Sequence, residues 1–481
     1  MTDASLEFYG AAGRVTGSCH ILRFGKRTVL LDCGLIQGGR EDESANADEF
    51  PFDPAAIDAV VLSHAHLDHS GRLPLLVRRG FRGRIHTHDA TRALLRILLY
   101  DAADIEMSVV RRENRRRAER GEPLAAPLFL RDDVEDTLEL VHGHRYDAWF
   151  EVVPGVRARL LDAGHIMGSA VVQLALGSGA ESVSLTYSGD LGQYDSPILR
   201  DPVTPSGSDL VVMETTYGDR CHRDFAASLD ELANVLEQAH RAGGNVLIPA
   251  FAVGRSQTLL YLLGKHFHDW RVDRWQIFLD SPLGIEASRI YWDFEHLFDE
   301  EAGELFRERD FMPKLPNLHF TRTGDESKLI NRFKRGAIVI AGSGMCNGGR
   351  ILHHFRRDLG RRGTHVVFTG FQPPGSLGRQ IIEGAETIEI HGAPYPVRAK
   401  IHTIGGFSAH ADQADLLRWY RGSGEAQPAP ATYLVHGDPK ALTGFQTHLA
   451  RVAGVQAHVP RSGERVDLRR LPESGHGPVR S

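Results

Sequence analysis

The feature that most constrains the fold is the stretch SHAHLDHSG at residues 63–71, which holds three imidazoles and one carboxylate. The apolar run IDAVVL just before it predicts a buried strand, with the polar cluster in the loop at its end. Imidazole nitrogens and carboxylate oxygens suit zinc. One ion cannot easily use all four groups, so His64 and His66 could hold one ion, and Asp68 and His69 a second. A plain polar loop is the simpler alternative, but this spacing of ligand-type side chains favours a two-metal site.

The bulk properties narrow the class of protein. At 481 residues the chain is too long for one ordinary domain, and we expect two or three. With 42% hydrophobic and 25% charged residues it has the composition of a soluble globular protein. Its net charge of -6 neither indicates nor excludes a nucleic-acid partner. The four cysteines form no CxxC pair, and we see no secretion signal and no apolar run of membrane-spanning length. We therefore expect a cytoplasmic protein without a membrane anchor.

Three more strands in the first half end in a similar way. Asp32 ends the apolar run at 28–31, His165 follows the strand predicted at 156–161, and Asp190 follows the one at 183–187. Strand ends that point to one rim are where sandwich and α/β enzymes place their chemistry. A lone histidine in such a loop would more often be a hydrogen-bonded loop residue, but the repeated pattern favours a ligand role for His165.

The pattern of elements changes twice along the chain. A linker rich in Pro, Gly and Ser ends at Ser208, and strands then alternate with helices, which predicts a parallel, doubly wound sheet. After this region the first pattern returns, with glycine-flanked histidines at His410 and His436. We therefore expect one domain composed of residues 1–208 and 389–468, a second domain of residues 209–388 inserted into it, and a flexible tail at 469–481.

An arginine-rich run lies in the segment at 90–148 that we predict to be helical. The run RRENRRR at 111–117 is most simply a solvated helix face. The alternative is a basic patch that binds phosphates.

The inserted domain carries a candidate phosphate site. The stretch AGSGMCNGGR at residues 341–350, with Ser343, Gly344 and Met345 in it, follows a strand and opens a helix. Its glycines let backbone N–H groups approach an anion, and a helix N-terminus favours negative charge. The alternative is a plain strand-to-helix turn. Arg255 and Arg379 lie in similarly placed loops, although the loop of Arg379 could also be an ordinary turn.

Two aromatic residues lie in the same loops. Phe251 and Phe371 could stack on the bases of a nucleic acid, and a packing role is the alternative.

These stretches together resemble the metallo-β-lactamase fold nucleases of the β-CASP family, which include the endonuclease subunit of the eukaryotic cleavage and polyadenylation machinery and its prokaryotic relatives. The resemblance extends over nearly the whole chain. It rests on Asp32, the histidine cluster, His165, Asp190, His436, and the stretches GRVTGSCH at 13–20, ETTYG at 214–218, PAFAVGR at 249–255, GSGM at 342–345 and GFSAH at 406–410. It implies an α/β fold in which an αββα metallo-β-lactamase sandwich carries an inserted doubly wound parallel-sheet β-CASP domain.

The resemblance also implies a ligand set for two zinc ions per chain. His64, His66 and His165 would hold one ion. The other would be held by Asp68, His69 and His436, with Asp190 bridging the two because its two oxygens can each face one cation. Asp32 would orient a ligand histidine rather than bind metal.

The implied chemistry is phosphodiester hydrolysis. Two zinc ions lower the pKa of a shared water and so provide a bridging hydroxide that attacks phosphorus in line. His410 resembles the family's proton donor to the leaving oxygen, and Glu214 would hold and charge its ring. Without the resemblance, Glu214 would be an ordinary carboxylate at a strand end. The expected catalytic residues are His410, Glu214, Asp190 and Asp68.

We therefore expect a zinc-dependent ribonuclease that acts on single-stranded RNA in RNA processing or decay, with no small-molecule cofactor. One alternative is a hydrolase of small esters such as a thiolesterase, although such an enzyme needs no phosphate-binding insertion. A second is a DNA nuclease of the same family, but DNA-directed members tend to lack a histidine like His436. A third is a non-catalytic RNA-binding scaffold, against which the complete ligand set argues. The sequence leaves open the RNA target, the endonuclease or 5′ exonuclease mode, and whether the protein is a monomer or a homodimer.

Overall fold

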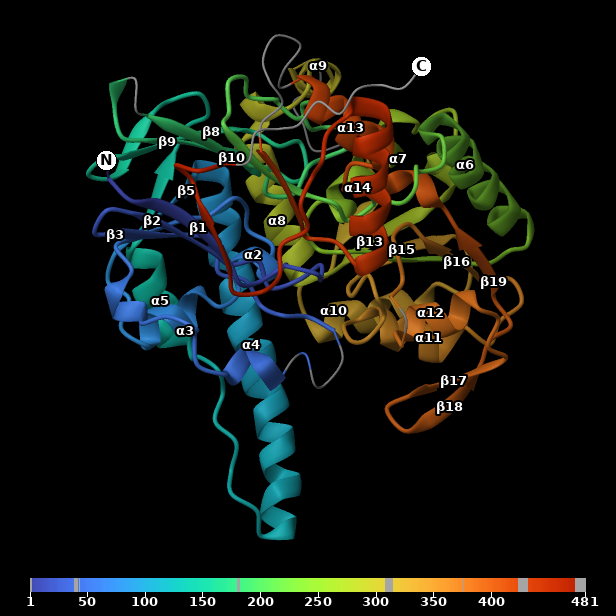
Figure 1. Ribbon diagram of the computed structural model, residues 1–481. Coiled ribbons are helices and arrows are strands. Elements are labelled where there is room, and N and C mark those ends of the chain that lie inside the picture. Colours follow the sequence, from blue (N-terminus) through green and yellow to red (C-terminus); the bar gives the residue numbers. More distant parts are fainter. Residues whose placement is uncertain are drawn as a thin grey trace. The chain divides into compact units, whose positions relative to one another are not determined.

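The computed structural model describes residues 2–38, 42, 44–179, 182–307, 315–373, 375–422 and 431–471 (Figure 1). The chain packs as two units. The first unit comprises residues 1–196, 200–221 and 410–481, and the second unit comprises residues 197–199 and 222–409. Most of the tail predicted at 469–481 lies outside the described residues.

The first unit is built on two sheets. One sheet has seven strands in the order β21-β1-β2-β3-β4-β5-β6, and the other has six in the order β20-β11-β10-β9-β8-β7. The strands of the first sheet are β1 (Ala4–Phe8), β2 (His20–Phe24), β3 (Arg27–Leu31), β4 (Ala59–Val61), β5 (Arg84–His88), β6 (Val141–His144) and β21 (Glu464–Asp467). Those of the second are β7 (Phe150–Val153), β8 (Val156–Asp162), β9 (Ala170–Leu176), β10 (Val183–Tyr187), β11 (Leu210–Glu214) and β20 (Ala431–Val435).

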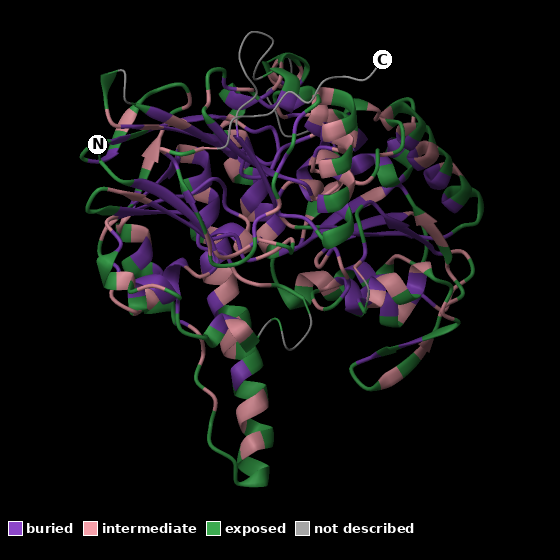
Figure 2. Cartoon of the chain, in the orientation of Figure 1, coloured by how far each residue is buried: buried purple, intermediate pink, exposed green. Residues whose placement is uncertain are grey.

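Alternating side chains explain why these sheets form a sandwich. Along β11, Leu210 and Val212 join the core between the two sheets, whereas Val211 and Met213 join a second core with the helices. A strand whose two faces are both apolar must be covered on both sides. The first unit's helices are α2 (Leu67–Ser70), α3 (Leu73–Arg78), α4 (Asp89–Arg120), α5 (Arg131–Glu139), α13 (Gln413–Gly422) and α14 (Pro439–Ala453). Most buried residues lie in the sheets and on the helix faces turned toward them (Figure 2).

The second unit contains a six-stranded sheet in the order β14-β13-β15-β12-β16-β19, and every neighbouring pair in it is parallel. Its strands are β12 (Val246–Pro249), β13 (Gln276–Asp280), β14 (Leu318–Phe320), β15 (Ala337–Ala341), β16 (His365–Phe368) and β19 (Lys400–Thr403), and a separate hairpin consists of β17 (Thr387–Ile390) and β18 (Ala393–Pro396). The fully buried run AIVIA of β15 shows why the sheet is parallel, because parallel strands covered on both faces are apolar throughout.

Helices connect the parallel strands of the second unit. They are α6 (Phe225–Arg241), α7 (Arg255–Lys265), α8 (Pro282–Asp293), α9 (Glu300–Arg307), α10 (Gly324–Leu329), α11 (Ile351–Asp358) and α12 (Leu377–Ile382). Short 3-10 helices lie at Val272–Arg274, Glu295–Leu297, Ile330–Arg332 and Gly405–Phe407 in this unit, and at Ala45–Ala47 and Pro54–Ala56 in the first unit.

The predicted fold class, an αββα sandwich with an inserted doubly wound sheet, is confirmed.

The limits of the two units differ from the expected domain boundaries. The chain enters the second unit at His222 and leaves it at Ala409, rather than at 209 and 388. The strand β11 was expected in the inserted sheet, but it pairs in parallel with β10 and β20 of the first unit. The strand β19 was expected in the first domain, but it pairs with β16 of the second unit. In addition, β6 ends the helical segment that we expected to reach residue 148.

Among the described residues, no helix combines the length and the apolar character needed to cross a membrane.

Candidate metal centre

The candidate ligands come from loops that follow strands of both sheets. His64 and His66 follow β4, and the short helix α2 then presents Asp68 and His69. His165 follows β8, Asp190 follows β10 and His436 follows β20. Since β8, β10 and β20 run in the same direction within their sheet, their carboxyl ends meet at one edge and bring these three side chains together.

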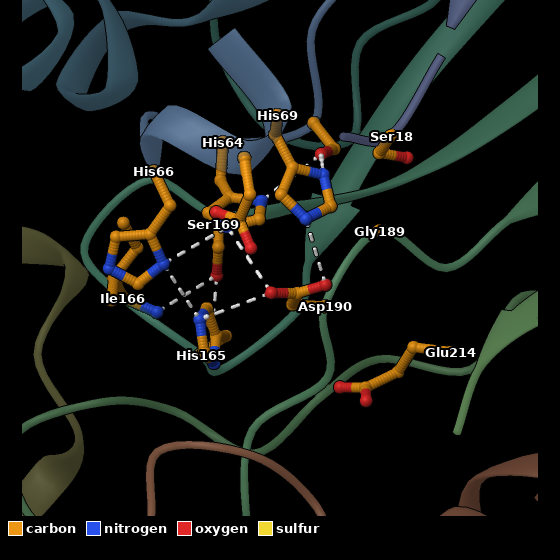
Figure 3. A network of polar contacts seen from close by, with 12 residues as sticks. Ser18, His64, His66, His69, His165, Ile166, Ser169, Gly189, Asp190 and Glu214 are labelled. Atoms are coloured by element: carbon orange, nitrogen blue, oxygen red, sulfur yellow. Dashed lines mark hydrogen bonds and ion pairs between the residues drawn. The ribbon is translucent and has the colours of Figure 1, made fainter. Parts of the chain in front are cut away.

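The first group of ligand atoms surrounds one oxygen of Asp190 (Figure 3). Asp190 Oδ2 lies 3.4 Å from His64 Nε2 and 3.6 Å from His165 Nε2. His66 Nδ1 lies 3.2 Å from the Nε2 atoms of both of these histidines. The family resemblance implied this combination of three histidines, with Asp190 as the bridge to the second group.

The second group surrounds the other oxygen of Asp190. Asp190 Oδ1 lies 3.1 Å from His69 Nε2 and 3.5 Å from His436 Nε2. The two Nε2 atoms are 3.0 Å apart, and His436 Nε2 is 3.6 Å from Asp68 Oδ2. The structure therefore brings all seven predicted ligands together, with one carboxylate between two groups of side chains.

The chemistry of this donor set fits divalent cations. Within the described part of the chain, Asp190 Oδ1 is buried and has no hydrogen-bond partner. Burial raises the pKa of Asp190, but the surrounding imidazoles outweigh this and hold the pKa well below its usual range, so the buried group is a carboxylate. His69 Nε2 faces His436 Nε2, and the Nδ1 atoms of both rings already face oxygen partners. Two ring nitrogens at this distance need a proton or a metal cation between them, because two facing lone pairs are unfavourable.

Asp32, to which the family resemblance assigns the orientation of a ligand histidine, lies behind the cluster. Its Oδ2 lies 2.7 Å from His69 Nδ1 and accepts hydrogen bonds from the hydroxyls of Ser63 at 2.8 Å and Tyr187 at 2.7 Å. Its Oδ1 accepts from the Ser63 backbone N–H at 2.7 Å. A carboxylate that holds Nδ1–H fixes the tautomer of His69 and turns the Nε2 lone pair toward the centre.

Other supporting residues were not identified from the sequence. Thr216 Oγ1 lies 3.1 Å from His436 Nδ1 and also donates to the His436 carbonyl oxygen at 3.2 Å. Ser169 Oγ accepts from the backbone N–H groups of His165 and Ile166, at 3.1 and 3.3 Å, and so shapes the loop of that ligand. Thr216 lies in the stretch ETTYG that carried the family resemblance, which was the one available signal for its role.

His410 and Glu214 form a pair next to the metal groups. His410 Nδ1 lies 3.2 Å from Glu214 Oε1 and 3.9 Å from Asp190 Oδ2. The buried Glu214 also accepts backbone hydrogen bonds from Leu191, at 2.7 Å, and Thr216, at 3.0 Å, which fix its orientation. Burial lowers the pKa of His410, but Glu214 and the two nearby aspartates raise it more, to about 9.

The predicted phosphate loop has a compact structure of its own in the second unit. The carbonyl oxygen of Gly344 accepts from Gln372 Nε2 at 2.9 Å, and α11 begins only at Ile351. A Cβ on Gly349 would lie 2.2 Å from the Gly342 oxygen, so the close approach of the loop to itself requires this glycine. The glycines of this loop therefore have a structural explanation, in addition to the predicted binding of phosphate by backbone N–H groups.

The other predicted phosphate contacts are placed as follows. Arg255 is the first residue of α7. Arg379 Nε lies 2.7 Å from Oε1 of Glu383, the residue that caps α12, so this arginine forms an ion pair within the protein. The ring of Phe251 packs on Gly344, where a Cβ would lie 2.9 Å from the ring, although the residue remains 46% exposed. Packing thus accounts for one face of this aromatic ring.

A buried polar cluster in the second unit was missed altogether. Asp280, at the end of β13, accepts hydrogen bonds from His354 Nε2 at 2.7 Å, Ser327 Oγ at 2.7 Å, Thr321 Oγ1 at 2.6 Å and Arg350 Nη1 at 2.7 Å. Arg350 is the last residue of the glycine loop, so this cluster fixes the end of that loop. Only the position of an aspartate after a strand hinted at it.

Comparison with known proteins finds the same architecture. Residues 12–250 match the metallo-beta-lactamase superfamily, residues 256–381 the Beta-Casp domain, and residues 394–460 the Zn-dependent metallo-hydrolase RNA specificity domain. A crystal structure of a protein of unknown function from Enterococcus faecalis has a TM-score of 0.51 at 13% identity, covering 97% of this chain and 100% of that one, and shows a similar fold.

Relatives with established names match over nearly the whole chain. A protein of Thermus thermophilus named a ribonuclease is 40% identical over 460 residues, which are 96% of this chain and 99% of that protein. The transcription termination factors FttA of Methanothermobacter thermautotrophicus and Pyrococcus abyssi are each 30% identical over 481 residues. These alignments cover 97% and 96% of this chain and 72% and 70% of those proteins. Because the chain is 40% identical to the ribonuclease of Thermus thermophilus and matches both the metallo-beta-lactamase and the Beta-Casp models, it belongs to the β-CASP family of metallo-β-lactamase-fold proteins.

Proposed function

We propose that the chain is a zinc-dependent ribonuclease that hydrolyses phosphodiester bonds of single-stranded RNA at a site for two metal ions. The observation that carries the proposal is the position of Asp190, whose Oδ2 faces His64 and His165 while its Oδ1 faces His69 and His436. RNA as the substrate is supported by the match to an RNA specificity domain and by the relative named a ribonuclease.

The ligand residues have distinct tasks in this proposal. His64, His66 and His165 would hold one ion, and Asp68, His69 and His436 would hold the other. Asp190 would serve both, since its Oδ2 faces the first group and its Oδ1 faces His69 and His436 of the second. Two bound zinc ions would lower the pKa of a water between them and neutralise charge on the phosphate. Asp32 and Thr216 keep the rings of His69 and His436 in the tautomer that turns Nε2 toward the centre.

His410 supplies the proton that the leaving oxygen needs. Because Glu214 faces Nδ1 at 3.2 Å, the proton to be transferred is the one on Nε2. Glu214 stabilises the protonated ring, and its own position is fixed by two backbone N–H groups. The pair thus resembles other arrangements in which a buried carboxylate orients and charges a catalytic histidine.

The proposal is tested by measuring metal content and cleavage together. Purified protein should contain about two zinc ions per chain, as two-metal sites do, and should cut an end-labelled single-stranded RNA. A ladder of internal cuts would identify an endonuclease, and release of mononucleotides an exonuclease. Hydrolysis of a thioester but not of RNA would refute the proposal in favour of an esterase. Absence of tightly bound transition metal, with activity supported only by magnesium, would refute the zinc assignment.

A further inference from the structure

The second half of α4, together with the segment that returns from it, forms an arm on the first unit. We define the arm as residues 105–128; in Figure 1 it extends beyond the sheets of that unit. About 23 Å of helix lies between residues 105 and 120, at 1.5 Å per residue. The helix ends at Gly121, which has a φ of 69° and reverses the chain. Figure 2 shows that much of this helical half is exposed.

One side of the arm helix is used for packing. Asn114 exchanges two hydrogen bonds with the backbone of Ala125, at 2.9 and 2.8 Å. Arg117 donates to the carbonyl oxygen of Pro123 at 3.2 Å, and Glu106 accepts from the backbone N–H of Leu128 at 3.1 Å. The returning segment therefore covers the helix face that carries residues 106, 114 and 117.

The opposite side carries four exposed arginines, Arg111, Arg112, Arg115 and Arg116. With 3.6 residues per turn, these four positions span about 140° of the helix, centred roughly opposite the covered face. Arg117 and Arg120 pair with Glu113, whereas the four exposed arginines form no ion pair within the described residues. We call these four residues the arginine face. Residues 111–120 carry six arginines and two glutamates in a chain whose net charge is -6.

These four like charges do not stabilise the helix through one another. Arg111 and Arg115 are four residues apart, as are Arg112 and Arg116, and like charges at this spacing destabilise an isolated helix. One carboxylate, the exposed Glu119, lies on the same side and offsets part of this charge. Charges of either sign keep a helix face solvated, and pairs of opposite sign would also stabilise the helix. A parallel row of guanidinium groups on a rigid helix instead matches a chain of phosphates, which guanidinium groups bind in a bidentate manner.

We propose that the arginine face binds the phosphate backbone of the single-stranded RNA substrate, outside the metal centre and without reading its sequence. The inference rests on the proposed function and adds a second contact region to it. The helix connects the two regions, because Thr91 in its first turn donates to the Gly168 carbonyl oxygen at 2.6 Å, in the loop that carries His165. From there the helix rises about 30 Å to Arg111. Two copies of the chain cannot pair arginine face against arginine face, because the like charges would repel each other.

The test compares two variants in which all four arginines are replaced, by glutamine or by lysine. Both replacements are good helix formers, so the helix is retained, and only the glutamine variant loses the charge. Binding of a 30-nucleotide single-stranded RNA is measured at several KCl concentrations with zinc-loaded protein. All forms carry His410→Ala to keep the RNA intact. Hydrolysis of bis(p-nitrophenyl) phosphate, which is too small to reach the arm, is measured in the same variants with His410 present.

The glutamine variant should lose four phosphate contacts. The slope of log K against log salt should become shallower by about 3, and binding at 0.1 M salt should weaken roughly several hundredfold. The lysine variant keeps the charge and should therefore keep the salt slope of the parent, with a smaller loss of affinity than the glutamine variant because lysine does not bind phosphate in a bidentate manner. Hydrolysis of the small ester should be unchanged in both. An unchanged slope in a folded glutamine variant would overturn the proposal, as would equal loss in both variants. A concentration-dependent dimer that only the glutamine variant loses, with unchanged RNA binding, would assign the face to a second copy and also overturn it. No RNA binding by the parent protein would overturn the proposed function itself.

Discussion

Replacing His410 by alanine should abolish proton donation while leaving the metal ions bound. His410 contacts Glu214 at 3.2 Å, whereas His436 Nε2 lies among ligand atoms, 3.0 Å from His69 Nε2 and 3.6 Å from Asp68. A positioned general acid is worth a factor of roughly 100 to 10,000 in rate. Since each factor of ten is 1.36 kcal/mol, the barrier should rise by about 2.7 to 5.5 kcal/mol. His436→Ala should lose cleavage together with zinc.

The measurements are zinc per chain and single-turnover rates on two RNAs. In one RNA the scissile leaving atom is the natural oxygen, and in the other it is sulfur, which leaves without protonation. His410→Ala should recover much of its lost rate on the sulfur substrate, because the missing proton is no longer needed. His436→Ala should recover little, because its defect is in metal binding. Loss of zinc in His410→Ala with normal zinc in His436→Ala would refute the reasoning, and so would equal recovery of both variants.

His410 is a cleaner test than its partner. Glu214 accepts the backbone N–H groups of Leu191 and Thr216 with its two different oxygens. In Glu214→Gln, the amide group would place an N–H donor against one of these donors and leave it unsatisfied, at a cost of about 1–3 kcal/mol in folding stability. That variant should therefore show reduced cleavage together with a lower melting temperature, so its rate does not report on the proton alone.

The remaining predictions concern metal binding. Asp190→Ala should weaken both metal sites, whereas His165→Ala should weaken mainly one. Equilibrium dialysis should therefore show a loss of about two zinc ions in Asp190→Ala and about one in His165→Ala; equal loss in the two variants would contradict the bridging role. Thr216→Val should lower zinc affinity roughly 10- to 100-fold, as the loss of such an orienting hydrogen bond does, and unchanged affinity would show that His436 needs no such partner. Chelation should lower the melting temperature by about 5 °C, since two ions that bind only the folded state at 100 times Kd add about 2.7 kcal/mol each and the unfolding entropy of 481 residues is about 1 kcal/mol/K. Scanning calorimetry with and without zinc measures this, and an unchanged temperature would indicate that the structure does not depend on the ions.

The positions of the candidate ligands at strand ends could be predicted because each depends on local sequence. An apolar run followed by a small residue and then by an acid or histidine specifies a strand and a polar residue just beyond its end, as at Asp190 and His165. Parallel strands then bring such residues to one edge. The assignment of each histidine to one ion did not follow from spacing, and it came from the family resemblance.

The limits of the two units could not be predicted in the same way. The run LVVM in β11 is as apolar as the runs in β12 and β15, so its sequence fits either sheet. Its partners β10 and β20 decide the matter, and β20 lies more than 200 residues away along the chain. The supporting contacts of Thr216 and Asp280 depend on partners from other segments, so local patterns say little about them.

Asp190 and Asp280 show what separates a candidate metal ligand from a structural carboxylate. Both are buried and both lie at the end of a strand, Asp190 just beyond β10 and Asp280 as the last residue of β13, so their local sequences are alike. The oxygens of Asp280 meet four donors, including the Arg350 guanidinium, and burial, which raises the pKa of this carboxyl, is outweighed by these hydrogen bonds. Its charge is therefore balanced within the protein. Asp190 Oδ1 has no donor within the described residues and faces imidazole nitrogens instead. A buried charge without donors is unfavourable unless a cation balances it, and this difference in hydrogen bonding distinguishes the candidate metal centre from the cluster around Asp280.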